Sequence, residues 1–162
     1  MAYYSKVLLP GEDVRTVGRL HWAIYLKAWF CLIIALLAGL DYLHLRTPDA
    51  DGASGGSVSL VAGAIGVLFL VAGLILMLKA WVRRVTTEIA ITDRRIIFKE
   101  GFVRRRTMEM NMSKVETVDV VQSIPGRIFN YGTILIRGTG STYEPLQLIA
   151  DPLSIRTAIV AQ

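Results

Sequence analysis

Histidine and cysteine, the side chains most often used in metal sites and in nucleophilic catalysis, are scarce in this sequence of 162 residues. The two histidines are His21 and His44, and the single cysteine is Cys31. A structural zinc site groups four ligands, and a catalytic cysteine needs a histidine beside it. Because no histidine or cysteine follows His44, neither cluster can form in the C-terminal part of the chain. We expect no metal and no cofactor, and we expect both histidines to lie near membrane headgroups.

Carboxylates and glycines offer little more chemistry. Glu109, Glu116 and Asp119 alternate with apolar residues, which is typical of the solvent face of a strand. No nucleophile or metal ligand accompanies them, so a general acid/base pair is not expected. The stretch Gly138-Thr-Gly140-Ser141 has the glycines of a phosphate loop but lacks the following Lys-Ser/Thr, and it is interpreted as a hairpin turn. The sequence predicts a protein that is not an enzyme and has no evident small-molecule substrate.

Cations are the abundant polar groups. Lysine and arginine number 18 against 13 acidic residues, for a formal net charge of +5. Near an anionic membrane surface each cation contributes about 1 kcal/mol of attraction. Eight cations in the central part of the sequence are therefore candidates for binding lipid headgroups or a partner: Arg83, Arg84, Arg94, Arg95, Lys99, Arg104, Arg105 and Arg106.

A second interpretation of these cations is equally consistent with the sequence. Arg83 and Arg84 would fix membrane topology, and the rest would form a solvated face, since strand alternation sends successive arginines to opposite sides. Nucleic acid is not an expected partner, because no array of aromatic residues accompanies the arginines.

Two long apolar stretches must position this basic region. No side chain from Gly52 to Leu78 is ionisable, and Trp22 to Leu40 is apolar apart from Lys27. A helix of about 20 such residues crosses the roughly 30 Å core of a bilayer. A signal peptide has a shorter apolar region, and a soluble helix has a polar stripe. The sequence therefore predicts two transmembrane helices, at residues 22–45 and 57–80.

The distribution of lysine and arginine predicts the orientation of this hairpin. Cations flank both predicted helices on one side, whereas the connecting loop at residues 46–56 contains only Arg46. Loops rich in lysine and arginine stay in the cytoplasm. We expect the N-terminal segment at residues 1–21 and the C-terminal domain at residues 85–162 to be cytoplasmic, with the loop on the periplasmic or outer side.

Small residues recur at four-residue spacing in both apolar stretches, which lets helix backbones approach closely. They either pack the two helices on each other or receive a helix from another subunit, in a homo-oligomer or a larger complex. We favour the first interpretation because glycine and alanine are common in membrane helices generally. The residues concerned are Cys31, Ala35, Gly39, Ser59, Ala62, Gly63 and Gly66.

After Arg84 the hydrophobic period becomes two, which predicts short antiparallel strands. Val118, Val120 and Val121 cannot all face one way, which indicates a bulge. Asp151 precedes a proline, an N-cap signal for a terminal helix. The expected strands cover residues 87–92, 95–99, 105–111, 114–122, 133–137 and 146–149. The fold class predicted is two transmembrane helices followed by an antiparallel barrel or sandwich that a C-terminal helix caps.

Several short motifs follow one another in a characteristic order. They are Leu9-Pro-Gly-Glu12, His21-Trp22, Thr92-Asp-Arg-Arg-Ile, Gly101 with Arg104-Arg-Arg-Thr, Val115-Glu-Thr-Val-Asp-Val, Gly126-Arg-Ile-Phe-Asn-Tyr-Gly-Thr133 and Arg137-Gly-Thr-Gly140. In this order they resemble the bacterial pleckstrin-homology-like (PH-like) membrane-flanked domain family. The resemblance implies a strongly bent antiparallel sheet capped by a C-terminal helix, a location in the bacterial cytoplasmic (inner) membrane, and a family whose role is largely undefined. It supplies no active site.

These features favour a non-enzymatic, membrane-anchored module for protein interaction, such as a scaffold or an accessory subunit. A partner peptide would add to an exposed strand edge or to the groove beside the terminal helix. The alternative is a sensor of anionic lipid headgroups that uses the basic residues. A specific inositol-phosphate pocket is not expected, because eukaryotic relatives of the fold use a long basic loop, and the turn at residues 92–94 is very short.

Overall fold

The computed structural model of the protein describes residues 7–47, 56–101, 106–139, 141, 142 and 145–161. The chain forms two compact units. One, the helical unit, contains Tyr25–Trp81, and the other, the strand unit, combines Met1–Ile24 with Val82–Gln162. The strand unit is therefore built from segments on both sides of the helical unit in the sequence.

The helical unit consists of two long apolar helices. A short 3-10 helix, η1 (Trp22–Tyr25), leads into α2 (Leu26–Arg46), and α3 (Gly56–Thr86) follows. At 1.5 Å per residue, the 21 residues of α2 and the 31 residues of α3 extend about 32 and 46 Å. By length and composition, both helices are able to cross a membrane. The helix of α3 continues beyond the span expected at residues 57–80, through Arg83 and Arg84 in its last turn.

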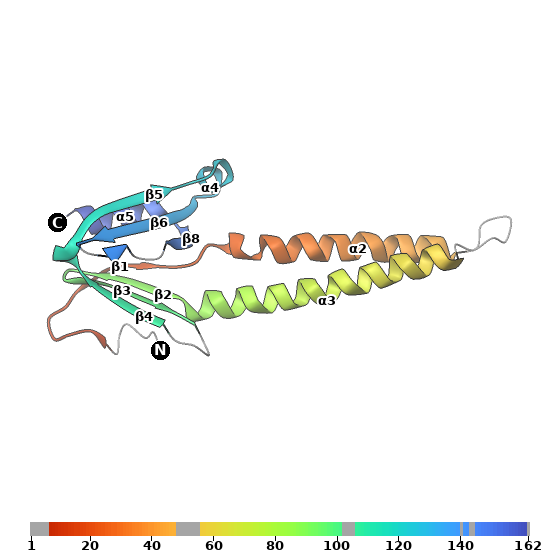
Figure 1. The fold of residues 1–162 in the computed structure, drawn as a ribbon, viewed down its shortest axis with the longest axis horizontal. Coiled ribbons are helices and arrows are strands. Elements are labelled where there is room, and N and C mark those ends of the chain that lie inside the picture. Colours follow the sequence, from red (N-terminus) through yellow and green to blue (C-terminus); the bar gives the residue numbers. More distant parts are fainter. Residues whose placement is uncertain (1–6, 48–55, 102–105, 140, 143–144, 162) are drawn as a thin grey trace. The chain divides into compact units, whose positions relative to one another are not determined.

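The strand unit begins with a four-stranded antiparallel sheet in the order β1-β2-β3-β4. Its strands are β1 (Val14–Gly18), β2 (Glu88–Thr92), β3 (Arg95–Glu100) and β4 (Arg106–Asn111). β1 comes from the N-terminal segment, for which the sequence analysis predicted no strand. It pairs with β2, with Gly18 opposite Ile89. The two apolar helices are thus inserted between adjacent strands of one sheet (Figure 1).

The second antiparallel sheet has β6 at its centre. It contains β5 (Val115–Val121), β6 (Tyr131–Gly138), β7 (Ser141–Thr142) and β8 (Leu146–Ala150). β6 pairs with each of the other three strands. The register of β5 shifts between Val115 and Thr117, whereas it is regular through Val118, Val120 and Val121, from which the sequence analysis inferred a bulge. The irregularity therefore lies closer to the start of the strand than expected. β6 and β7 pair across the predicted hairpin turn.

Three short helical segments complete the strand unit. They are η2 (Met112–Lys114), which connects the sheets, α4 (Ile124–Ile128), between β5 and β6, and the terminal helix α5 (Pro152–Val160). α4 was not predicted, since its proline and glycine were interpreted only as a break in the strands. α5 begins where expected, but Asp151 caps it without a side-chain hydrogen bond and has a φ of 47°.

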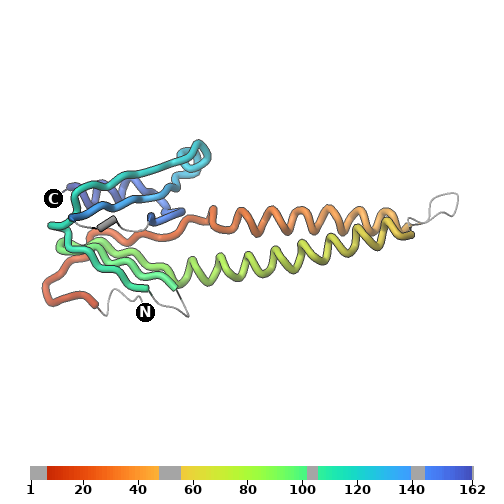
Figure 2. Tube along the Cα trace, viewed as in Figure 1, coloured from red at the N-terminus to blue at the C-terminus, as the bar shows by residue number. Residues whose placement is uncertain are grey.

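The chain between β1 and α2 joins the two sheets along one side. Leu20 forms a bridge with Ile149, and the backbone N–H of His21 donates to the carbonyl of Leu148 at 2.7 Å. In Figure 2 this N-terminal segment runs beside β2 and then reaches β8. The segment therefore belongs to both sheets and closes the gap between them on this side.

The core lies between the two sheets and beneath α5. Its members come from each layer and are almost fully buried, as expected for the inward-facing positions of alternating strands and for the buried stripe of a helix. They include Ile89, Ile91, Ile134, Ile149 and Ile155. The predicted fold class, two long apolar helices, antiparallel sheets and a capping C-terminal helix, is confirmed.

Candidate functional site

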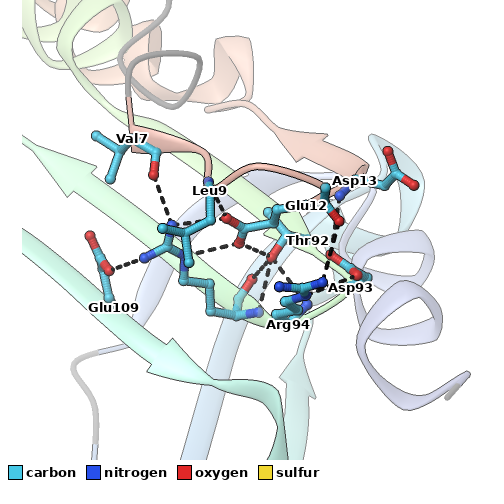
Figure 3. A network of polar contacts seen from close by, with 10 residues as sticks. Val7, Leu9, Glu12, Asp13, Thr92, Asp93, Arg94 and Glu109 are labelled. Atoms are coloured by element: carbon cyan, nitrogen blue, oxygen red, sulfur yellow. Dashed lines mark hydrogen bonds and ion pairs between the residues drawn. The ribbon is translucent and has the colours of Figure 1, made fainter.

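A buried carboxylate in the N-terminal segment, that of Glu12, lies in a network of polar contacts. Both oxygens of Glu12 accept from the guanidinium of Arg95, with Nε and Nη2 each at 2.9 Å (Figure 3). The Glu12 carboxylate also accepts from the backbone N–H of Leu9 at 2.9 Å and lies 2.8 Å from the hydroxyl of Thr92. Two parallel N–H···O bonds are the strongest arrangement of an arginine and a carboxylate. The pair fastens the N-terminal segment to the turn between β2 and β3.

Charge and hydrogen bonding set the protonation of this pair. The hydrogen bonds from Arg95 lower the pKa of Glu12 from 4.5 to about 2, with burial acting in the opposite direction. The same hydrogen bond raises the pKa of Arg95 above its usual range. Arg95 also pairs with Glu109 at 2.8 Å and donates to the carbonyl of Val7 at 2.8 Å. Its donors are engaged within the strand unit, so this pair is a structural element of the fold.

The predicted cations do not gather at one place. We call the end of the first sheet at Gly18 and Glu88 the exit end, because the chain leaves there toward α2 and returns there from α3. Lys99 lies at this end, opposite Glu88, and so does Arg106, opposite Glu100. Arg83 and Arg84 lie in the last turn of α3, so four of the eight predicted cations are near the exit end. Arg83 itself is engaged there, since its Nε donates to Glu100 at 3.0 Å.

Arg94 and Arg95 lie at the opposite end of the same sheet, which we call the turn end. β3 begins at Arg95 and ends at Glu100. The five steps between these residues, at about 3.3 Å each, separate the two ends by roughly 17 Å. Arg94 is half-exposed there and lies 3.6 Å from Asp93. Arg94 and Arg95 thus form a group apart from Lys99 and Arg106.

The last three predicted cations are Arg84, Arg104 and Arg105. Arg84 lies in the last turn of α3, close enough to His21 to affect its titration. Arg104 and Arg105 fall outside the described residues. Of the eight predicted cations, the structure therefore describes six, and it places them in two groups at opposite ends of the first sheet.

Aromatic rings gather beside the exit end. His21 stacks on Tyr131 with centroids 5.1 Å apart, and Trp22 meets Phe129 edge to face at 5.6 Å. Burial lowers the pKa of His21, and the positive charge of Arg84 lowers it further. The cluster attaches α4 and the start of β6 to the residues that lead into α2.

The predicted small residues lie in the helical unit, where α2 and α3 approach each other. A Cβ added at Gly66 would lie 3.5 Å from the carbonyl oxygen of Ala35 and 3.5 Å from the nitrogen of Gly39. At Gly73, which the sequence analysis did not single out, a Cβ would lie 2.7 Å from the Leu32 side chain. Both helices therefore contribute small residues to the contact between α2 and α3.

Four further predicted residues of this set lie near the same contact or at its end. A Cβ at Gly63 would lie 3.0 Å from the ring of Tyr42, and one at Gly73 would lie 3.4 Å from Cys31. Ser59 is buried and bonds to the Gly56 carbonyl in its own helix, and Ala62 is half-buried.

The described residues offer little for metal binding or catalysis. No group of three or more histidine, cysteine, aspartate or glutamate residues is placed there to hold a metal ion. A cavity of about 20 Å³ at the exit end is lined by Arg83, Thr87 and Glu100 among others. This volume has room for about one water molecule, which is too small for a metabolite.

Two antiparallel sheets, joined by the chain between β1 and α2 and capped by a C-terminal helix, define the strand unit as a PH-like module. A family model described as the bacterial PH domain matches residues 13–159, and the chain belongs to this family. The matched region includes β1 and both apolar helices, so it contains the insertion described above. No curated protein and no solved structure matches the chain.

Proposed function

We propose that the protein is a membrane-anchored PH-like module that mediates protein interaction at the cytoplasmic face of the bacterial inner membrane and has no enzymatic activity. The two long apolar helices support the anchoring, and the pairing of β1 with β2 across the inserted hairpin supports its topology. Strands that pair must lie on the same side of a membrane. If one helix crosses the bilayer, the other crosses it back, and the strand unit is attached by two connections.

Charge supports the cytoplasmic side for the strand unit. Arg15 and Arg19 precede the hairpin and Lys79, Arg83 and Arg84 follow its apolar part, whereas the sequence between the helices has few cations. Short segments rich in lysine and arginine are retained in the cytoplasm.

Open strand edges support a role in protein interaction. Within the described residues, β4 pairs only with β3, and β5 pairs only with β6. An unpaired edge offers backbone N–H and C=O groups to an extended peptide, which is a common mode of peptide recognition. Thr107 on β4 and Thr117 on β5 are exposed at these strands.

Site-specific photo-crosslinking of the full chain in native membranes tests this role. A photoreactive residue at position 107 or 117 should yield a discrete crosslinked product. The matched control replaces Thr157, an exposed threonine on α5. Equal yields of crosslinked product at all three positions would contradict recognition at a strand edge. The absence of a product at every position would contradict it as well.

A lipid sensor is the second candidate, because Lys99 and Arg106 lie at the exit end, where the chain connects to the hairpin. In nanodiscs, anionic lipid should then slow amide exchange in β3 and β4 relative to zwitterionic lipid. Salt should weaken the effect, as should Arg106→Gln, while Arg94→Gln at the turn end should not. Exchange that is insensitive to lipid charge would eliminate this candidate.

A further inference from the structure

α4 presents an apolar surface where a soluble domain would normally be polar. Ile124 is 79% exposed and Ile128 is 73% exposed. Residues four apart lie on the same face of a helix, so these two side chains are neighbours. Phe129 follows at 49% exposure, and Val121, at the end of β5, is 56% exposed. Large apolar side chains that are exposed together mark an interaction surface.

Local polar contacts hold α4 in this position. The Ser123 hydroxyl accepts from the backbone N–H of Gly126 at 3.2 Å, and the amide of Gln122 donates to the carbonyl of Tyr131 at 3.1 Å. Gly126 packs so closely that an added Cβ would lie 2.7 Å from the Tyr131 oxygen. The turn is therefore fixed by the backbone, and the isoleucines do not fold back onto the core.

α4 contacts the part of the strand unit that leads into the first apolar helix. Phe129 packs edge to face on Trp22, and α2 begins four residues after Trp22, at Leu26. Tryptophan at the start of a membrane helix lies at the headgroup level. A side chain in contact with Trp22 lies at about the same depth.

The charge on α4 fits a lipid surface. Arg127 is exposed and lies between the two isoleucines in the sequence, so the helix combines apolar side chains with a cation. Anionic headgroups attract such a cation, and short apolar faces are buried about 5–10 Å into the boundary of headgroups and acyl chains.

We propose that α4 is a membrane wedge: Ile124, Ile128 and Phe129 insert into the lipid interface of the bilayer that the hairpin crosses. The wedge is a third attachment of the strand unit, in addition to the two chain connections, and it fixes which face of the unit points away from the lipid. This inference rests on the proposed membrane anchoring.

Fluorescence quenching in liposomes tests the wedge. The full chain, with Cys31→Ala as background, receives a single cysteine by Ile128→Cys, labelled with a small environment-sensitive fluorophore. The liposomes contain phosphatidylcholine and phosphatidylglycerol. A nitroxide-labelled lipid reports contact with the bilayer, and iodide reports contact with water.

Two control positions make the result specific. Val160→Cys labels an equally apolar, 61% exposed site on α5. It adjoins Ala161, whose carbonyl accepts from Arg15 at the turn end. Leu70→Cys labels the middle of α3 and reports whether the hairpin is in the bilayer at all.

We expect the nitroxide lipid to quench the label at position 128 at least about twice as strongly as the label at position 160. Iodide should quench the label at position 160 more strongly than the label at position 128. If position 70 is quenched by lipid but position 128 behaves like position 160, the wedge is wrong and the anchoring stands. If position 70 is not quenched by lipid, both are wrong. Protection of position 128 from both quenchers would indicate a covering protein surface and would overturn the wedge.

Discussion

Arg95 illustrates at the scale of single residues why a basic stretch does not identify a binding site. Its guanidinium is bidentate on Glu12 and also pairs with Glu109, and its side chain is only 14% exposed. Arg83 is likewise engaged, with Glu100. The partner of Arg95 lies in the N-terminal segment, on the other side of the hairpin, so no local pattern in the sequence could reveal the pair.

Removing the charge of Glu12 should destabilise the strand unit. Glu12→Gln leaves Arg95 without its buried counter-charge, which typically costs about 3 kcal/mol of unfolding free energy. Asp13→Asn is the matched control, because Asp13 is exposed, and it should change the unfolding free energy by no more than about 0.5 kcal/mol. Denaturant unfolding of the detergent-solubilised chain measures both, and equal effects of the two variants would show that the pair does not stabilise the unit.

The lowered pKa of Glu12 also predicts an acid sensitivity. In the unfolded chain the carboxyl titrates near 4.5, and in the folded unit near 2. The folded state therefore binds fewer protons in this range, and the stabilisation is full above pH 4.5 and is lost as the pH falls from about 4.5 to about 2. We expect this part of the pH dependence of unfolding to be absent in Glu12→Gln. An identical acid profile in the wild-type protein and the variant would refute the assignment.

At the scale of elements, the sequence predicted those strands whose burial pattern is local. In β2, Ile89 and Ile91 face the core, and in β3 Ile96 and Phe98 do so. This repeat of two is visible within a single segment. β1 was missed because Val14–Gly18 is short and its partner β2 follows the hairpin. α4 was missed because a proline and a glycine in five residues are typical of a break.

The exposed residues of α4 were missed for a related reason. A sequence pattern shows that Ile124 and Ile128 are apolar but not that the local fold leaves them outside the core. That outcome depends on Gly126 and on contacts with Tyr131.

Gly126→Ala should disrupt α4, because the new Cβ meets a backbone oxygen that cannot move freely. We expect a loss of about 1–3 kcal/mol in the stability of the strand unit and faster amide exchange in residues 121–131. Pro125→Ala, in the same helix, is the control and should leave that exchange largely unchanged. If the glycine variant exchanges like the wild-type protein, the close approach at Gly126 is not required.

β1 makes a second prediction at this scale. A fragment that begins at Thr86 lacks β1 and Glu12, so the core residues Ile89 and Ile149 lose their neighbours in the N-terminal segment. We expect it to remain unfolded in solution. A version in which a Gly/Ser linker replaces Tyr25–Trp81 retains both parts of the strand unit and should fold. Dispersed amide resonances in the short fragment would contradict an essential role for β1.

At the scale of the whole molecule, the inserted hairpin is the feature that joins structure to function. A PH-like module tied at one terminus would be free to rotate about a single connection. Here two neighbouring strands each continue into an apolar helix, so the module is attached twice. This arrangement requires an even number of membrane crossings, so the proposed function depends on the topology of the hairpin.

Thiol labelling in intact cells tests that topology most directly. With Cys31→Ala as background, Thr47→Cys places a thiol at the end of α2, and Val160→Cys places one in the strand unit. A membrane-impermeant maleimide should label position 47 in intact cells, and position 160 only after the inner membrane is permeabilised. Labelling of both positions in intact cells, or of neither before permeabilisation, would contradict a hairpin that crosses the membrane twice with the PH-like module inside.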